Sequence, residues 1–189
     1  MDYKICFGSL AIIIGFLGYI PYFKELFSGK IKPHAFSWLI WSILPAITFA
    51  AQATRGAGPG AWVSGFWFLS CFVIFLFSMK RGEKNIVFLD WLSLFAAGVS
   101  ILFWYLTSSP LLTVIIITCI DCIAFIPTIR KSYAKPYEEN ATLYICSSIS
   151  YVFSIMAMEH YSVITTFNPA VLVPINFLFA CMLFWRRNV

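Results

Sequence analysis

The apolar residues of this chain gather in seven runs that are separated by short polar connections. An α-helix needs about 20 mostly apolar residues to cross the bilayer hydrocarbon, which is about 30 Å thick. The pattern therefore predicts seven transmembrane helices. The predicted spans are residues 5–23, 35–54, 61–79, 86–106, 110–129, 141–160 and 163–185. We interpret the first run as a span and not as a signal peptide, because no small-residue cleavage site follows it.

Composition agrees with this interpretation. Of the 189 residues, 61% are hydrophobic, 19% are aromatic and 11% are charged. Soluble domains carry about 25% charged residues. The connections are too short to hold a soluble domain, so the sequence predicts an all-α protein whose surroundings are the lipid bilayer.

The basic residues lie almost entirely on one side of the predicted spans. One side carries Lys24, Lys30, Lys32, Lys80, Arg81, Lys84, Arg130, Lys131, Lys135, Arg186 and Arg187. The other side carries Lys4 and Arg55. Short loops that are rich in Lys and Arg stay in the cytoplasm. We therefore predict an external N-terminus and a cytoplasmic C-terminus. The net charge of +5 is explained as a topology signal, and no basic stripe on a soluble fold indicates nucleic-acid binding.

The cysteines give no positive indication of a cofactor. All six lie inside predicted spans: Cys6, Cys71, Cys119, Cys122, Cys146 and Cys181. Buried cysteine usually behaves as a small apolar residue. Cys119 and Cys122 are one helical turn apart, but no further Cys or His accompanies them in the pattern that metal sites show. We predict neither a metal nor a cofactor.

The chain contains an internal repeat of three helices. A shift of 106 residues places Pro21 on Pro127, Trp38 on Tyr144 and Ser70 on Asn176. The same shift also aligns the basic residues at the ends of corresponding spans. The run at residues 86–106 has no counterpart, and an odd helix between two triplets leaves them parallel. The predicted units are residues 1–81, a linker helix at 82–106, and residues 107–189. Parallel repeats of this kind occur in transporters, with the site at the repeat interface.

This 3+1+3 organisation resembles the SWEET and PQ-loop superfamily. A proline stands near the cytoplasmic end of the first helix in each triplet, Pro21 and Pro127, and a short basic loop follows each. Tyr22 and Thr128 stand where PQ-loop proteins have glutamine. The resemblance implies alternating-access transport of a small polar solute, sugar-like or amino-acid-like, through a pocket between the triplets. The stretches around Lys32 and Gly56–Gly60 are similar to bacterial membrane proteins, which implies a bacterial plasma membrane.

Asp121 is the strongest candidate for a functional residue. It lies nine positions before Arg130, or about 13 Å along a helix, and therefore near the bilayer centre. A carboxyl group at that depth usually faces a bundle interior or a water-filled path. The predicted spans supply no Lys or Arg as its partner, and removal from water then favours the protonated form. Asp121 is thus a candidate for substrate binding and proton coupling. The alternative is a neutral acid that ties two helices together.

Other candidate residues share this depth or the repeat. Asn176 and Ser70 lie ten positions before their basic ends, and we expect them to bind substrate or to serve as interhelical hydrogen-bond partners. Trp38, Trp41 and Tyr144 are expected either to line the pocket or to form an interfacial aromatic belt.

Four prolines inside spans are hinge candidates: Pro21, Pro45, Pro127 and Pro174. Each removes one helical hydrogen bond and frees the carbonyl four residues earlier. On the cytoplasmic side, His34 and Glu25 are either gate residues or part of a solvated loop.

The sequence lacks the residues that several classes of membrane protein require. The last span has no lysine for a retinal Schiff base, and the two histidines, His34 and His160, fall at opposite membrane faces, which disfavours a haem site. Asp121 has no second carboxylate for an aspartyl dyad, so we do not expect an enzyme. We predict a transporter, proton-linked if Asp121 titrates. The alternative is a receptor or assembly protein on the same scaffold. The sequence leaves open which solute is carried and whether copies of the chain form a homo-oligomer.

Overall fold

The computed structural model describes residues 2–83, 86–107 and 109–188. Within these ranges the regular structure consists of helices alone. The α-helices are α1 (Asp2–Phe27), α2 (Ala35–Thr54), α3 (Trp62–Arg81), α4 (Phe88–Thr107), α5 (Pro110–Ala134), α6 (Ala141–Ala157) and α7 (Val163–Asn188). Two short 3-10 helices are η1 (Gly58–Ala61) and η2 (Pro136–Glu138). For the described ranges, the prediction of an all-α fold with seven α-helices is confirmed.

In the described part of the chain, five helical segments are long and apolar enough to cross a membrane. They are α1, α2, α3 together with η1, α5 and α7. These segments indicate an integral membrane protein. The helices α1, α5 and α7 continue beyond their predicted ends, so that basic residues such as Lys24 and Lys131 lie in their final turns. The polar ends of these helices are therefore helical as well.

Helix α6 is shorter than its predicted span at residues 141–160. It ends at Ala157, because Met158 takes an extended conformation with φ −62° and ψ 130°. The backbone N–H of Glu159 then donates to the carbonyl of Ala57 at 3.2 Å. The predicted C-terminal end of this span is wrong, since this contact with a distant connection draws the chain out of the helix.

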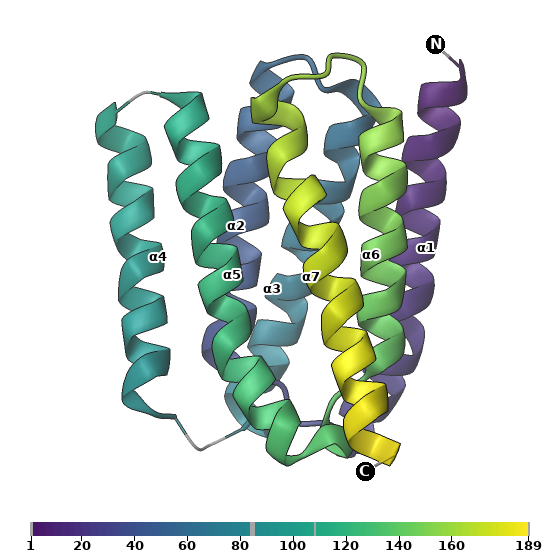
Figure 1. Cartoon of the computed structure of the whole chain (residues 1–189), viewed down its shortest axis with the longest axis vertical. Coiled ribbons are helices and arrows are strands. Elements are labelled where there is room, and N and C mark those ends of the chain that lie inside the picture. The colour runs from purple at the N-terminus through teal and green to yellow at the C-terminus, as the bar shows by residue number, and fades with distance from the viewer. Residues whose placement is uncertain (1, 84–85, 108, 189) are drawn as a thin grey trace.

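Six of the helices pack as successive neighbours around the centre of the bundle (Figure 1). Starting at α1, the order of contacts is α1, α6, α7, α5, α2 and α3, and α3 returns to α1. Helix α4 lies beside α5 and α2, at one side of the molecule. In the described part of the chain, six helices therefore surround the centre of the bundle, and α4 lies outside them.

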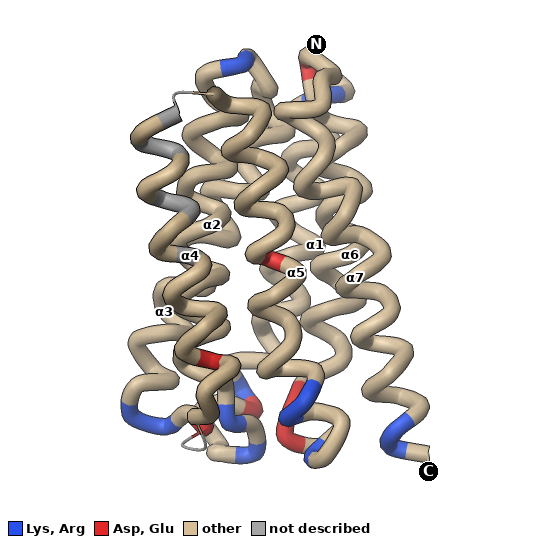
Figure 2. Tube along the Cα trace, turned by 60° about the vertical axis from the view of Figure 1, so that its left-hand side comes forward, with Lys and Arg blue, Asp and Glu red and all other residues tan. Residues whose placement is uncertain are grey.

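Charged residues gather at the two ends of the bundle (Figure 2). Lys and Arg are abundant at the end where α1, α3, α5 and α7 finish, while the opposite end carries Lys4 and Arg55. The N-terminus and the C-terminus lie at opposite ends of the molecule. Lys84, which belongs to the third predicted basic connection, lies outside the described residues. One acidic residue stands in the middle of α5, far from both charged ends.

Small residues allow α1 and α6 to approach closely. A Cβ atom added to Gly18 would lie 2.7 Å from the Cβ of Cys146. One helical turn further along the same interface, the hydroxyl of Ser150 donates to the carbonyl of Ala11 at 2.7 Å. Glycine and serine at such contacts let helix backbones pack tightly where no hydrophobic effect drives association. The α1–α6 contact therefore depends on the absence of a side chain at Gly18.

Candidate functional site

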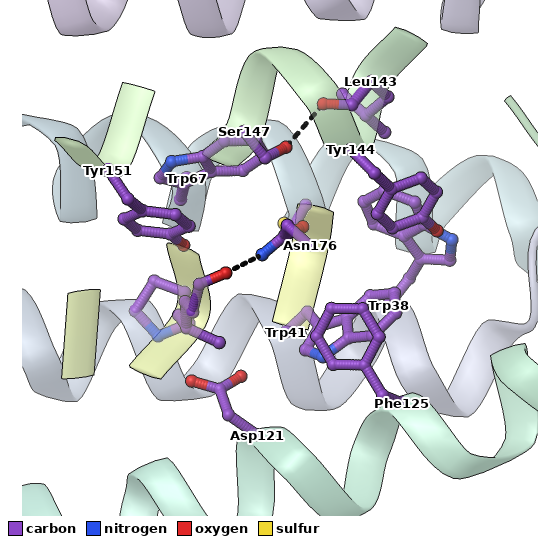
Figure 3. Close-up of a pocket in the computed structure, with 13 residues that line it drawn as sticks. Trp38, Trp41, Trp67, Asp121, Phe125, Leu143, Tyr144, Ser147, Tyr151 and Asn176 are labelled. Carbon is purple, nitrogen blue, oxygen red and sulfur yellow. Dashed lines mark hydrogen bonds between the residues drawn. The ribbon is translucent and has the colours of Figure 1, made fainter. Parts of the chain in front are cut away.

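A cavity lies inside the bundle between α2, α3, α5, α6 and α7. It contains about 440 Å³ of space that protein atoms do not fill, a volume that includes open solvent at its mouth. Its walls combine aromatic rings with a few polar groups, as Figure 3 shows. The lining residues are Trp38, Trp41, Pro45, Trp67, Cys71, Asp121, Phe125, Leu143, Tyr144, Ser147, Tyr151, Leu172 and Asn176. Pockets that are mostly apolar and contain a few convergent polar groups are typical of small-molecule sites.

The cavity brings together most of the residues that the sequence singled out. Asp121, Asn176, Trp38, Trp41 and Tyr144 all line it, although they come from four different helices. The three aromatic residues, Trp38, Trp41 and Tyr144, are 3%, 7% and 3% exposed. They consequently do not form the lipid-facing belt that the sequence left open.

Asp121 lies at the cavity wall on α5, and its side chain points inward (Figure 3). The amide nitrogen of Asn168 on α7 donates to its Oδ2 at 3.0 Å and to the hydroxyl of Thr118 at 3.3 Å. This bond ties α5 to α7, which is the structural role that the sequence left open. The carboxyl group also borders the cavity. Among the described residues, no Lys or Arg pairs with Asp121.

The sequence did not identify Asn168 as the partner of Asp121. The two residues are 47 positions apart on different helices, and only their packing brings them together. Asn168 is 4% exposed and does not line the cavity, so it approaches the carboxyl group from behind. The residue type of Asn168 was the signal in the sequence, because an amide side chain inside a membrane helix requires a polar partner.

Asn176 faces the cavity from α7. Its amide nitrogen donates to the carbonyl of Leu172, four residues earlier in the same helix, at 2.8 Å. Within the described ranges its side chain makes no hydrogen bond to another helix, unlike the interhelical role considered from the sequence. Ser147 on α6 behaves in the same way, because its hydroxyl donates to Leu143 of its own helix at 2.7 Å. Both side chains remain at the cavity wall.

Ser70 does not line the cavity. On α3 the inward positions are Trp67 and Cys71, and Ser70 is half-buried beside them. Since each residue turns a helix by about 100°, a one-residue offset moves a side chain to another face. The expected pairing of Ser70 with Asn176 is therefore not formed, and Cys71 occupies the facing position.

The burial patterns explain this offset. On α3 the inward stripe is Trp67, Cys71, Ile74 and Ser78, and on α7 it is Leu172, Asn176, Phe179 and Leu183. These two stripes coincide at a shift of 105 residues. In α2 and α6, by contrast, Trp38 and Tyr144 coincide at 106. The connection between the second and third helix therefore differs by one residue between the two halves, and the linear alignment carried the wrong register into α3.

The aromatic rings of the cavity support one another. Trp67 stacks on Tyr151 with ring centroids 5.7 Å apart and an angle of 17° between the planes. Trp41 lies 4.8 Å from Phe125 and 5.5 Å from Trp38. Aromatic pairs at such distances hold each other in fixed orientations. Trp67, Tyr151 and Phe125 were not identified from the sequence, where they are indistinguishable from other aromatic residues of the spans.

Three buried polar atoms at the cavity lack a partner among the described residues. They are Nε1 of Trp41, Nε1 of Trp67 and the hydroxyl oxygen of Tyr144. A buried donor without a hydrogen bond costs about 1–3 kcal/mol. Unsatisfied donors beside a cavity are thus candidates for contact with a bound molecule or with water.

The candidate hinge prolines occupy different environments. Pro45 lines the cavity, and Pro127 is buried in α5. Pro21 is half-buried in α1, and Pro174 is exposed on the outer face of α7. All four stand inside continuous helices. Of the four, Pro45 is the one whose ring borders the candidate site.

A buried polar cluster lies at the start of α2, on the side with many basic residues. Nε2 of His34 lies 3.0 Å from Oδ2 of Asp90, and the two side chains are 1% and 0% exposed. Burial lowers the pKa of His34 below its ordinary value, and Lys131 and Arg130 act in the same direction. Asp90 acts against this shift. The structure thus places His34 in a packed polar contact, whereas the sequence left open a solvated loop.

Within the described residues, no group of three or more His, Cys, Asp or Glu side chains is arranged to hold a metal ion. Comparison of the chain with protein-family models, with curated proteins and with solved structures gives no match. The cavity and the contacts around it are therefore the features of the molecule that bear on its function.

Proposed function

We propose that this protein is a transporter that moves a small polar solute across the membrane by alternating access. The observation that carries the proposal is the central cavity, whose walls combine aromatic rings with Asp121 and Asn176. It lies among α2, α3, α5, α6 and α7, so both halves of the chain contribute to it. A site shared by two halves can be exposed to either side when the halves move relative to each other.

The packing order supports two three-helix units, residues 1–81 and 107–189. Around the centre the helices follow as α1, α3, α2 and then α5, α7, α6, so the third helix of each half lies between the other two. The proposed linker is residues 82–106. Helix α4 (Phe88–Thr107) covers most of this range and packs outside the ring of six helices, as expected of a linker. The two units are proposed to be parallel, related by an axis along the membrane normal.

The proposed orientation places the basic end of the bundle in the cytoplasm. Lys and Arg gather where α1, α3, α5 and α7 end (Figure 2). Because short basic connections stay on the cytoplasmic side, the N-terminus is then external. The host membrane is proposed to be a bacterial plasma membrane.

Polar contacts between the two units close the basic end. The ammonium group of Lys131 donates to Glu139 at 2.8 Å and to the carbonyl of Lys32 at 2.9 Å. The amide of Asn140 donates to the carboxylate of Glu25. Lys131 and Glu139 both belong to the second unit, whereas the contacts of Lys131 with the Lys32 carbonyl and of Asn140 with Glu25 join the two units. Release of a solute to the cytoplasm requires that they separate, which makes them the proposed cytoplasmic gate.

Different contacts join the units at the opposite end. The amide nitrogen of Gln52 donates to the carbonyl of Thr165 at 2.9 Å, and the hydroxyl of Ser64 donates to the Gln52 amide oxygen at 2.7 Å. The hydroxyl of Ser154 donates to the carbonyl of Gly60 at 2.9 Å. The ammonium group of Lys4 also donates there to the carbonyl of Met156 at 3.0 Å and to the hydroxyl of Tyr161 at 3.0 Å, in an exposed contact. The buried contacts at this end are between neutral groups, whereas charged groups take part at the other end. The two proposed gates therefore differ in chemistry.

Solute uptake into proteoliposomes tests the proposal. Purified protein is assayed with a panel of sugars, amino acids and amines, with and without a pH gradient. The variants Asp121→Asn and Asn176→Ala are compared with Ser70→Ala, whose side chain lies outside the cavity. We expect flux of one solute class that both cavity variants abolish and that Ser70→Ala retains.

The same experiment separates transport from the alternative of a receptor or assembly protein. Saturable binding of a solute to folded protein, without flux of any solute, would refute the transporter and favour the receptor. Proton coupling through this carboxyl group predicts that Asp121→Asn abolishes pH-driven accumulation while the variant still folds as the wild type does, and an unchanged pH dependence would refute it.

A further inference from the structure

We infer that the cavity binds an organic monocation, such as a quaternary or protonated amine, at Asp121 and exchanges it for a proton. This inference rests on the proposed function, because it names the substrate class of the same cavity. It follows from two observations: the carboxyl group has no cationic partner among the described residues, and aromatic faces line the same cavity.

The carboxyl group of Asp121 is equipped to receive a positive charge. Its side chain is 4% exposed, and one oxygen, Oδ2, is held by the amide of Asn168 at 3.0 Å. Among the described residues, no hydrogen bond reaches the other oxygen. A buried carboxylate is costly unless it is neutralised by a proton or by a counter-ion. Since none of the described residues supplies a cation here, a counter-ion for the carboxylate has to enter through the cavity.

The aromatic lining selects an organic cation over an inorganic one. Trp41, Trp67, Phe125, Tyr144 and Tyr151 border the same space as Asp121. Aromatic faces attract an ammonium group within about 6 Å of the ring centroid, and the attraction grows when water is excluded. A sodium ion requires several oxygen ligands, but among the described residues no group of three or more His, Cys, Asp or Glu side chains is placed to hold a metal ion. The alkyl groups of an amine, by contrast, also gain from the apolar walls.

Exchange follows from the shared carboxyl group. The protonated acid is neutral and offers no charge to a cation, so binding of the cation requires that the proton leave. One proton is released for each monovalent cation that binds, and the net charge of the occupied site stays constant. A carrier whose binding site must hold either a proton or a cation in order to reorient couples the two fluxes in opposite directions.

The groups around Asp121 leave it as the titrating group. Cys71 faces it from α3 and Tyr151 from α6, while Cys122 is its neighbour on α5. Thiols and phenols are ordinarily neutral at pH 7. Helices α2 and α7 contribute tryptophan, proline, leucine and amide side chains to the cavity. On α4 the acidic residue is Asp90, which is engaged by His34 and by Arg130 at the basic end.

Equilibrium binding to the purified, detergent-solubilised full chain provides the test. Choline chloride is the probe, 3,3-dimethyl-1-butanol is its neutral isostere, and sodium chloride at the same ionic strength is the salt control. Tryptophan fluorescence reports binding, because Trp38, Trp41 and Trp67 line the cavity. Calorimetry in buffers of different ionisation enthalpy measures the protons released.

We expect choline to bind at least tenfold more tightly than its neutral isostere. Its affinity should rise about tenfold per pH unit below the pH at which Asp121 titrates and level off above it, with one proton released per choline bound. Asp121→Asn, which keeps the shape of the side chain, should weaken binding at least tenfold at pH 8 and abolish proton release. Ser70→Ala should bind as the wild type does.

Equal binding of choline and its neutral isostere by the wild-type protein would overturn the inference without relying on any variant. Choline affinity that does not change with pH would overturn it as well. Flux of a sugar or another neutral solute, lost in Asp121→Asn, would refute the cation site while leaving the transporter intact. Proton-releasing choline binding without flux would uphold the cation site and refute the transporter.

Discussion

Removal of the ammonium group of Lys131 should destabilise the protein strongly. This group donates to three acceptors: the carbonyl of Lys32 at 2.9 Å, the carbonyl of Glu138 at 3.1 Å and the carboxylate of Glu139 at 2.8 Å. The side chains of Lys131 and Glu139 are 3% and 1% exposed. Lys131→Met leaves a buried carboxylate without a counter-charge, and such a loss costs about 3–5 kcal/mol.

A double-mutant cycle isolates the contribution of the ion pair. In Lys131→Met with Glu139→Gln the uncompensated charge is gone, and the remaining cost comes from unsatisfied carbonyl groups. We expect the double variant to be less destabilised than the sum of the single variants, by about 1–3 kcal/mol. Lys135→Met is the matched control, because Lys135 is 50% exposed and pairs with Glu83 at 3.3 Å. Its expected cost is about 0–1 kcal/mol.

The free energy of unfolding is measured by denaturation of the purified protein in mixed detergent and SDS micelles. A cost for Lys131→Met as small as that for Lys135→Met would refute the reasoning. Strict additivity in the cycle would show that Lys131 and Glu139 are not coupled. Either result would also remove the argument that Glu139 holds the Lys131 ammonium group in its contact with the Lys32 carbonyl.

Two further predictions concern other contacts. Burial lowers the pKa of His34, so the unfolded chain takes up a proton at a higher pH than the folded chain does. Stability from this site is therefore present above about pH 6.5 and lost as the pH falls below it. Melting temperatures measured between pH 8 and pH 5 should show this loss of stability in the wild-type protein and not in His34→Gln. His160→Gln, at an exposed histidine, is the control. A stabilising contribution of His34 that grows on acidification would contradict the prediction. Gly18→Ala should cost about 1–3 kcal/mol, because the new Cβ would lie 2.7 Å from the Cβ of Cys146. Gly98→Ala is the control, because no atom lies within 4 Å of a Cβ added there, and it should be neutral or slightly stabilising. An equal effect of the two substitutions on the melting temperature would disprove the packing argument.

The candidate site was partly predictable because depth in a membrane helix can be counted along the chain. The spacing from Asp121 to Arg130 placed the carboxyl group near the middle of the bundle, and the structure shows it at the cavity wall. Asn176 was located by the same counting. The helical face toward which a residue points is harder to predict, because an apolar helix in a membrane lacks a polar side facing water.

Ser70 illustrates this difficulty. Its depth and its place in the repeat matched Asn176, yet Cys71 holds the inward position on α3. The register between α3 and α7 differs by one residue from that between α2 and α6, and a difference in one connection produces it. Gly60 belongs to that connection, where a Cβ would lie 3.0 Å from the carbonyl oxygen of Ser154. Such a close contact is not visible in a one-dimensional alignment.

Lys131 shows the same limit for charged residues. By sequence it is one of many basic residues that mark the cytoplasmic side. In the structure it is part of α5 and is buried against Glu139, while its neighbour Arg130 is exposed. Counting positive charges gives the expected orientation of the helices, but it does not distinguish a charge that contacts water from one that holds two connections together.

The sequence by itself determined that this chain forms apolar helices, where most of them begin and end, and how deep their polar residues lie. These properties depend on the length and composition of single segments, because each helix satisfies its own backbone hydrogen bonds in the membrane. The tertiary structure alone decided which faces meet. It brought Asn168 behind Asp121, stacked Trp67 on Tyr151 and paired His34 with Asp90. Such contacts depend on side-chain volumes and rotations of separate helices, which no single segment encodes.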